Sequence, residues 1–191
     1  MESMIYTLIG SRDTPPSAQK VLTDFAYEAA SRWYIGRSGA ADGADKCLEI
    51  GVKNYMTNNG ISGMSRDKYM EIYLPKNGFM NRNKHRAGYY DVSTFDNKED
   101  ALAIAENLHP AWDRCSEMAK MLHGRNPYQI LGRDLNTPSD FVVLWGKLEN
   151  TNNPLVKGGT RTGMRLALQY NVPVYNINTL EGLNMILRGF D

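Results

Sequence analysis

Three glycine-rich segments of this chain carry residue types that could bind a phosphate-bearing ligand. They are 9–12 (IGSR), 37–45 (RSGAADGAD) and 158–163 (GGTRTG), and each lies between a predicted strand and a predicted helix. Glycine lets a ligand approach the backbone closely, and the free N–H groups at a helix N-terminus attract a phosphate. None of the three segments matches the GxGxxG pattern or a Walker loop, so the sequence predicts neither a standard dinucleotide site nor a P-loop.

A later polar cluster could complete such a site. Arg125 follows a predicted helix that Pro127 cannot continue, and its guanidinium could pair with a phosphate while Asn126 or Gln129 reads a base edge. Arg125 could equally be a cation that caps a helix C-terminus. The ligand-binding candidates are Gly10, Ser11, Arg12, Ser38, Gly39, Asp42, Gly43, Asp45, Arg125, Asn126, Gly158, Gly159, Thr160 and Gly163.

Catalysis would need a carboxylate beside the ligand, and no residue is assigned that role. Cleavage of a nucleotide N-glycosidic bond requires a carboxylate near the ribose, and Asp42, Asp45 and Asp134 are candidates. Asp42 and Asp45 could instead cap a helix or accept hydrogen bonds from ribose hydroxyls. Asp134 lies in a Gly-Arg-Asp turn, and Asp140 begins a strand at the opposite edge of the sheet, which removes it from consideration.

Metal-ligand spacing is missing from the histidines and cysteines. His85, His109 and His123 form no HxxxH or HxxE pattern, and neither Cys47 nor Cys115 is spaced for a shared metal with a histidine or a second cysteine. We place both cysteines in predicted helices and interpret them as free thiols of a reducing compartment. The sequence therefore predicts no metal site and no cofactor.

The elements that would position these segments alternate between strand and helix. Apolar runs predict strands at Met4–Ile9, 34–37 and Met70–Leu74, and helical spacing follows the first two, up to Trp33 and over 44–56. Such β-α-β-α alternation favours a parallel sheet. The carboxyl ends of parallel strands share one edge, where ligands of this architecture bind, so the glycine-rich segments should converge there.

The second half continues the pattern less regularly. Residues 76–98 form an irregular excursion, and an Asn-rich loop covers 148–157. The most hydrophobic strand, 140–145, should lie centrally in the sheet. The remaining predicted elements are helices at 98–108, 111–123, from 160 to about 170 and at 180–187, and a strand at 172–177. The predicted fold class is α/β: a three-layer, Rossmann-like, doubly wound and mostly parallel sheet flanked by helices, in one domain over 1–191.

Composition narrows the function classes. The chain has 191 residues, 42% of them apolar and 23% charged, with a formal net charge of +1. These fractions are typical of a globular protein, and the near-zero charge disfavours a global basic surface for nucleic acid. No apolar run approaches the roughly 20 residues that span a bilayer, and the N-terminus lacks the basic start of a signal peptide. We expect a cytoplasmic protein without a membrane partner.

The combined motifs resemble a known family. The TLIGSRD strand-loop at 7–13, the SGAADGAD segment at 38–45 and the GGTRTG loop at 158–163 resemble the SLOG superfamily. That Rossmann-like group includes LOG phosphoribohydrolases, the DNA-processing protein A family and YpsA-like proteins. The run from 109 to 145 looks like the YpsA-related branch, which occurs in phage and bacterial genomes. The resemblance covers 7–175.

This resemblance implies a nucleotide or nucleotide-derived ligand on the glycine-rich loops. It also implies a homo-oligomer in the cytoplasm, or in the host cytoplasm of a phage. One departure matters: LOG enzymes follow their P-G-G-x-G-T loop closely with a catalytic glutamate. Here the loop is KGGTRTGMR, and no glutamate follows before the helix is well under way. The hydrolase assignment therefore loses its main catalytic residue.

Three functions remain open on the sequence. The first is binding of a nucleotide-like ligand for sensing or sequestration, which the loops and the missing glutamate favour. The second is nucleotide N-glycosidase or phosphoribohydrolase activity of LOG type, with the excursion as a lid. The third is single-stranded DNA binding, since KNGFMNRNKHR at 76–86 interleaves basic and aromatic residues suited to backbone contact and base stacking.

Overall fold

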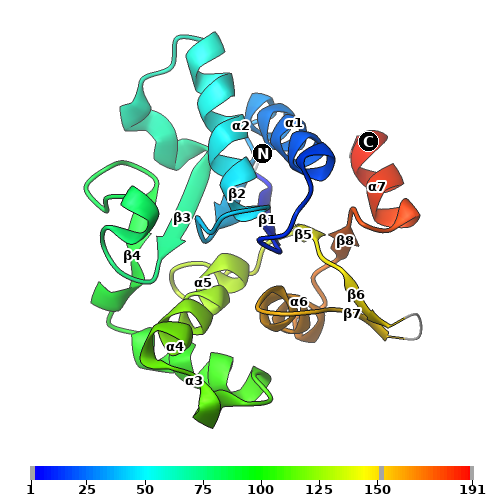
Figure 1. The fold of residues 1–191 in the computed structure, drawn as a ribbon. Helices are drawn as coiled ribbons and strands as arrows, with labels where there is room; N and C mark the ends of the chain where they lie inside the picture. The colour runs from blue at the N-terminus through cyan, green and yellow to red at the C-terminus, as the bar shows by residue number, and fades with distance from the viewer. Residues whose placement is uncertain (1–2, 151–152, 190–191) are drawn as a thin grey trace.

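A parallel sheet forms the centre of the molecule (Figure 1). The computed structural model describes residues 3–150 and 153–189. Among them, six strands hydrogen-bond in the order β4-β3-β2-β1-β5-β8, and every pair is parallel. The strands are β1 (Ile5–Gly10), β2 (Ile35–Ser38), β3 (Met70–Leu74), β4 (Tyr89–Asp91), β5 (Phe141–Trp145) and β8 (Val174–Asn176).

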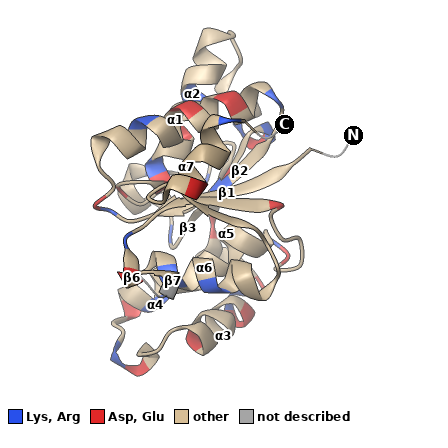
Figure 2. Ribbon diagram, turned by 90° about the vertical axis from the view of Figure 1, so that its right-hand side faces the viewer, with Lys and Arg blue, Asp and Glu red and all other residues tan. Residues whose placement is uncertain are grey.

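Helices cover both faces of this sheet, as Figure 2 shows. One face carries α1 (Pro16–Ser31), α2 (Asp45–Asn58) and α7 (Leu180–Leu187). The other carries α5 (Asn126–Leu131) and α6 (Thr160–Gln169), with α3 (Lys98–Leu108) and α4 (Glu117–Gly124) packed against them. The predicted three-layer, doubly wound, Rossmann-like α/β fold is confirmed.

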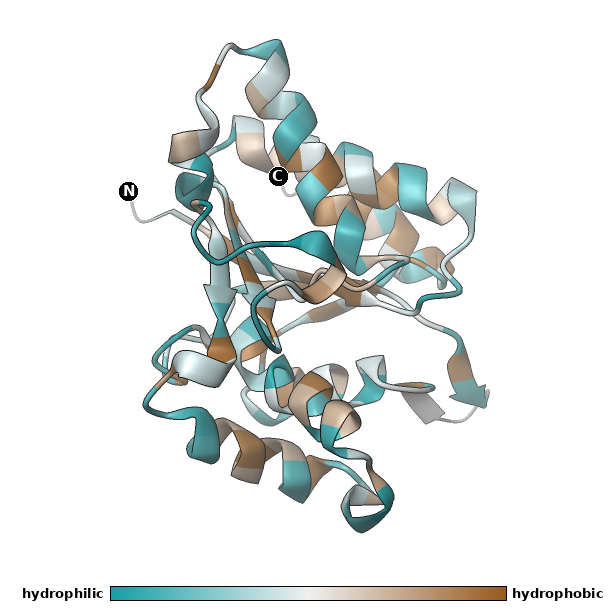
Figure 3. Cartoon of the chain, turned by 60° about the vertical axis from the view of Figure 1, so that its left-hand side comes forward, coloured by the Kyte–Doolittle hydropathy of each residue, from teal (hydrophilic) through white to brown (hydrophobic). Residues whose placement is uncertain are grey.

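The two faces bury separate apolar cores, and apolar residues follow the strands in Figure 3. Side chains alternate across a strand, so Tyr6 and Leu8 of β1 enter the core under α1 and α2, while Ile9 enters the core under α6. All five residues of β5 are buried, as expected for a strand covered on both faces. No helix within 3–150 and 153–189 is long and apolar enough to cross a membrane.

The order of the strands creates a switch point between β1 and β5. From β1 the chain adds β2, β3 and β4 on one side, and then crosses to add β5 and β8 on the other. Connections from the carboxyl ends of β1 and β5 therefore leave in opposite directions and open a crevice, which is where ligands bind in open α/β sheets.

Most predicted elements are confirmed, and four details differ. The excursion 76–98 contains β4, which extends the sheet beyond β3. The Asn-rich loop forms an antiparallel hairpin of β6 (Leu148–Asn150) and β7 (Asn153–Val156). The helix predicted at 111–123 is shorter, because a 3₁₀ turn at Trp112–Arg114 precedes α4. The most hydrophobic strand, β5, lies between β1 and the edge strand β8 and is therefore not central.

Pro127 lies in the first turn of α5, where the sequence suggested only the end of the preceding helix. Arg125 is both the C-cap of α4 and the N-cap of α5, with helical backbone angles of φ −80° and ψ −22°. A proline at the start of a helix loses no hydrogen bond, since the first N–H groups have no partner within the helix. Two short helices thus meet at Arg125, and α5 carries the chain under β2 and β3.

Candidate functional site

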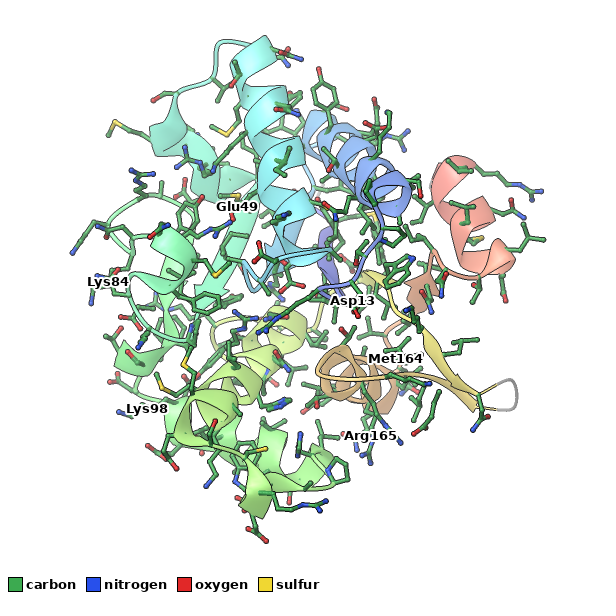
Figure 4. All side chains as sticks on the ribbon, viewed as in Figure 1. Asp13, Glu49, Lys84, Lys98, Met164 and Arg165 are labelled. Atoms are coloured by element: carbon green, nitrogen blue, oxygen red, sulfur yellow. The ribbon has the colours of Figure 1, made fainter. Side chains whose placement is uncertain are left out.

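A pocket of about 390 Å³ opens at the switch point. Its walls come from the loops after β1 and β2, the junction of α4 and α5, and the loop that begins α6. Figure 4 labels Asp13 on the loop after β1 and Met164 on α6, and the pocket opens between these two elements. We call it the glycine-loop pocket. Its volume is typical of small-molecule sites, which run from roughly 300 to 1,000 Å³.

Most of the predicted ligand-binding residues lie on its wall. Residues that the sequence did not select also line it, among them Asp13, Gln129, His123 and Lys157. Basic groups outnumber acidic ones on this wall, which suits an anionic ligand. The predicted residues that line the pocket are Gly10, Ser11, Arg12, Asp45, Arg125, Asn126, Gly158, Gly159, Thr160 and Gly163.

A buried ion pair joins the loops behind the pocket. Asp45, the first residue of α2, accepts a hydrogen bond from the Gly10 N–H at 3.1 Å and lies 3.7 Å from Arg125 Nη2. Both residues are about 5% exposed or less. Burial raises the pKa of Asp45, although Arg125 and backbone N–H groups act in the opposite direction. Asp45 therefore holds the β1 and β2 loops together, and it provides no side-chain cap to α2.

Arg125 remains a cation despite its burial. Burial lowers its pKa to about 10, with Asp45 raising it and Arg12 lowering it, so the guanidinium is protonated at neutral pH. Its Nη1 donates to the Gly39 carbonyl, and its Cζ lies 5.1 Å from the centre of the Phe79 ring. These contacts fix the direction of the guanidinium plane.

Two buried donors on the pocket wall have no acceptor. The Nε of Arg125 and the Nε2 of Gln129 are both buried, and neither has a hydrogen-bond partner among the residues that the structure describes. A buried N–H without an acceptor costs about 1–3 kcal/mol, more when it is charged. Both residues line the same pocket, but these two donor atoms lie against Gly39 at its back.

The third glycine-rich loop supplies free backbone N–H groups. Gly158 has φ +76°, which favours glycine, and Gly159 is the N-cap of α6. A Cβ at Gly158 would meet nothing within 4 Å, and one at Gly159 would approach only His123 Cε1, at 3.9 Å. This loop is therefore open. In the first turn of α6 the Arg161 and Thr162 N–H groups donate to the Gly158 and Gly159 carbonyls, so a ligand would meet the N–H groups that precede them.

Four predicted residues lie behind the pocket. The Ser38 hydroxyl donates to the Leu8 carbonyl at 2.6 Å. A Cβ on Gly39 would come within 2.3 Å of Gln129 Nε2, and one on Gly43, at φ +84°, within 2.2 Å of the Ser11 carbonyl. Asp42 is exposed and pairs with Lys46 at 3.6 Å. The two glycines let the loops pack closely, while Asp42 faces away from the pocket.

Asp134 lies in a different cavity. A cleft of about 610 Å³ runs beside it between Arg37, Glu71 and the segment 94–97, and we call it the Arg37 cleft. The Asp134 carboxylate accepts hydrogen bonds from the Asn136 and Thr137 N–H groups, and these help to lower its pKa. Asp134 is a turn residue and does not line the glycine-loop pocket.

The carboxylates near the ligand loops offer little for hydrolysis. Asp140 accepts from the Ile5 N–H at the amino edge of the sheet, as expected. Of the two acidic residues on the pocket wall, Asp45 is occupied by Gly10 and Arg125, whereas Asp13 is exposed. Asp13 was absent from the sequence-based candidates because it follows the glycine-rich segment without a pattern of its own.

The basic stretch 76–86 is partly occupied within the molecule. Arg82 pairs with the buried Glu49 at 2.6 Å, and Lys84 lies 3.7 Å from Asp91 (Glu49 and Lys84 are labelled in Figure 4). Phe79 packs against the core and receives Arg125 on its ring. Two of the four Lys and Arg side chains of this stretch and its aromatic ring are thus engaged with the protein itself, whereas Lys76 and Arg86 are exposed.

Two of the scattered histidines and a cysteine come together at the edge of the pocket. His109, Cys115 and His123 each offer a ligand atom within 4.8 Å of the others. Cys115 lies in the turn before α4 and not in a helix, which corrects its predicted position, while Cys47 is in α2 as expected. Motif spacing missed this cluster because the chain reverses direction between α3 and α4.

Comparisons with known proteins give two distant structural likenesses. No protein-family model matches the chain, and no curated protein matches it. Among solved structures, the Moco carrier protein of Chlamydomonas rheinhardtii aligns at 14% identity and a TM-score of 0.42, over 91% of this chain and 74% of its own. DNA processing protein A from Helicobacter pylori, described with a single-stranded DNA binding mode, aligns at 16% identity and a TM-score of 0.48, over 97% and 72%. The function must therefore be argued from the pocket itself.

Proposed function

We propose that the glycine-loop pocket binds a nucleotide or nucleotide-derived anion, for sensing or sequestration. The observation that carries this proposal is the lining of the pocket, where Arg12, Arg125 and Lys157 meet the open glycine loop at the start of α6. A pocket with cationic side chains and a helix N-terminus favours an anionic ligand.

The open loop at the start of α6 supports the same ligand class. Gly158 and Gly159 leave room for a bulky group beside the first turn of α6. A phosphate there would accept hydrogen bonds from backbone N–H groups at the positive end of the helix dipole. Arg12 and Lys157 add positive charge at the mouth. Arg125 and Gln129 would then bind a second phosphate, a ribose or a base edge.

Binding is favoured over hydrolysis because neither carboxylate on the pocket wall is placed to act on a ribose. Asp45 is buried in its ion pair, and Asp13 is exposed to solvent. An N-glycosidase needs a carboxylate held close to the ribose and shielded from water. LOG-type activity remains the alternative outcome of the test below.

The test measures affinity by calorimetry for adenosine, AMP, ADP and inorganic phosphate, together with the matched variants Gly159→Asp and Gly159→Asn. Asp and Asn are both favoured N-cap residues, so both variants should fold. The Asp carboxylate would repel a phosphate at this position. We expect AMP or ADP to bind, Gly159→Asp to lose at least about tenfold in affinity, and Gly159→Asn to change it far less.

Two results would contradict the proposal. If no phosphate-bearing probe binds, the proposed class of ligand is wrong. If the Asp and Asn variants have equal affinities, the phosphate does not bind beside Gly159. Chromatography of the same mixtures for free base separates the alternative, because release of adenine with turnover would make the protein an N-glycosidase. Native mass spectrometry of the purified protein checks directly for a co-purifying nucleotide.

A further inference from the structure

Two imidazoles and a thiol converge where α3 turns back into α4. His109 is the C-cap of α3, Cys115 directly precedes the α4 N-cap Ser116, and His123 lies in the last turn of α4. A ligand atom from each residue lies within 4.8 Å of the others. Nitrogen and sulfur ligands of this kind are those that zinc prefers in proteins.

The separations bring these atoms close to a coordination sphere. Cys115 Sγ lies 3.7 Å from His109 Nδ1 and 3.9 Å from Nε2, and the rings of His109 and His123 have centroids 4.4 Å apart. Zn–N bonds of about 2.0–2.1 Å and Zn–S bonds of about 2.3 Å in a tetrahedron place the sulfur about 3.6 Å from the bound nitrogen and about 5 Å from the other nitrogen of that ring. The His109 ring must therefore turn to direct one nitrogen at the ion, which is a rearrangement of one side chain.

The ligand atoms have weak competing contacts or none. His123 Nδ1 is buried and has no hydrogen-bond partner in the part of the chain that the structure describes. His109 Nδ1 accepts from the Ala111 N–H at 3.2 Å, and the Cys115 thiol lies 3.6 Å from the Ala111 carbonyl. On binding a metal ion, His109 and Cys115 would replace these two long contacts with coordination bonds.

Helix packing holds the three side chains in place. A Cβ on Gly124 would lie 2.7 Å from Leu102 Cδ2, so glycine at this position lets α3 pack closely on the end of α4. Arg165 of α6, labelled in Figure 4, donates to the Leu108 carbonyl at 2.7 Å and fixes the end of α3. Such preorganisation lowers the cost of gathering metal ligands.

We propose that His109, Cys115 and His123 bind a zinc ion, with the fourth position left to water or to an atom of a bound ligand. Three protein ligands with one open position are typical of zinc sites that act on a bound molecule. His123 also lines the glycine-loop pocket, so the metal site and the pocket share a wall. This proposal does not depend on the proposed nucleotide function.

The test uses the full chain, freed of any affinity tag and treated with a chelator. Zinc is titrated in competition with a chromophoric chelator, and Co²⁺ is titrated as a spectroscopic substitute. We expect one ion per chain and a near-ultraviolet band from thiolate-to-cobalt charge transfer. Cys115→Ser should abolish that band, and His123→Ala should lower zinc affinity by more than the roughly 10–100-fold that loss of an outer-shell partner costs.

Matched controls separate ligation from folding. His85→Ala removes the exposed third histidine, and Cys47→Ser changes the buried thiol of α2; both should retain the cobalt band and the zinc affinity. Circular dichroism of the chelated variants establishes that they fold. Failure to bind one zinc ion, or retention of the thiolate band in folded Cys115→Ser, would each overturn the proposal. None of these measurements includes a nucleotide, so failure of the pocket hypothesis leaves their meaning unchanged.

Discussion

The glycine-loop pocket and the Arg37 cleft both contain a buried arginine, yet they use it differently. In the cleft, Arg37 donates to Glu71 at 2.7 Å and to the Thr137 carbonyl at 2.6 Å. In the pocket, Arg125 lies 3.7 Å from its carboxylate and keeps a buried donor without a partner. The cleft is the larger cavity, at about 610 Å³ against about 390 Å³. The two arginines thus differ in how fully the protein itself satisfies them, and this difference, not cavity size, makes the pocket our candidate site.

The largest expected effect comes from removing Arg125. Arg125→Ala should lower the free energy of unfolding by about 3–5 kcal/mol, because it leaves the buried Asp45 without its cation. It should also abolish binding of a phosphate-bearing probe. Urea denaturation and calorimetry measure the two effects. Because loss of the fold would also abolish binding, the double variant Asp45→Asn, Arg125→Leu serves as control: it should regain stability without regaining binding. Retained binding in that variant would refute the role of Arg125.

Removal of Arg37 should affect stability alone. Arg37→Gln loses charge-assisted hydrogen bonds to Glu71 and Thr137, which costs about 2–3 kcal/mol. Affinity for AMP or ADP should stay within about twofold, since the lost contacts are satisfied within the protein and lie in the other cavity. Urea denaturation measures the stability, and calorimetry measures the affinity. A large loss of affinity with normal folding would mean that the Arg37 cleft is part of the ligand site.

Two glycines of the pocket itself should respond differently to alanine. A Cβ on Gly10 would come within 2.5 Å of the Trp145 carbonyl, whereas one on Gly159 would meet only His123 Cε1, at 3.9 Å. Gly10→Ala should therefore destabilise the fold by about 1–3 kcal/mol through overpacking, and Gly159→Ala by less than about 0.5 kcal/mol. Thermal or urea unfolding checks both. Equal costs would mean that the loop after β1 can shift freely away from β5.

The smallest effect is a dependence of stability on pH. Burial lowers the pKa of His123 from 6.5 to about 4, with His109 and Arg125 acting in the same direction. The unfolded chain therefore takes up the proton first as the pH falls. Stability should decline from pH 6.5 to pH 4, by about 1–2 kcal/mol for a side chain in partial contact with water. Urea unfolding in a chelator measures this decline.

The pH effect has a direct control. His123→Gln should show a flatter profile than the parent chain over the same window, since glutamine does not titrate. His85→Ala should leave the slope unchanged, because His85 is exposed. A parent profile as flat as that of His123→Gln would place His123 in contact with water in solution.

Local patterns were enough to predict most of the strands and helices. Met70–Leu74 and Leu180–Leu187 have the predicted bounds, because apolar spacing and flanking turn residues specify them locally. β4 could not be predicted in this way: YYD is three residues long and becomes a strand only by pairing with β3. α5 was missed for another reason, since Pro127 is compatible with both the end and the start of a helix.

The candidate site was predictable to the level of loops and not of side chains. Asp42 and Asp45 lie three residues apart in one glycine-rich segment, and nothing in that segment shows that Asp45 faces Gly10 while Asp42 faces solvent. The unpartnered donors of Arg125 and Gln129 depend on packing between distant segments. The grouping of His109, Cys115 and His123 depends on a chain reversal that motif spacing does not encode.

The backbone at Arg125 belongs to two helices at once, since this residue ends α4 and begins α5. His123 lies two residues before it, so the same short stretch carries both the buried guanidinium and a ligand of the proposed zinc ion. Any ligand that changes the zinc affinity by some factor must have its own affinity changed by zinc by the same factor. Where binding at one site changes the affinity at the other, each measurement depends on how fully the other site is occupied, and metal content becomes a variable to be fixed in every ligand titration.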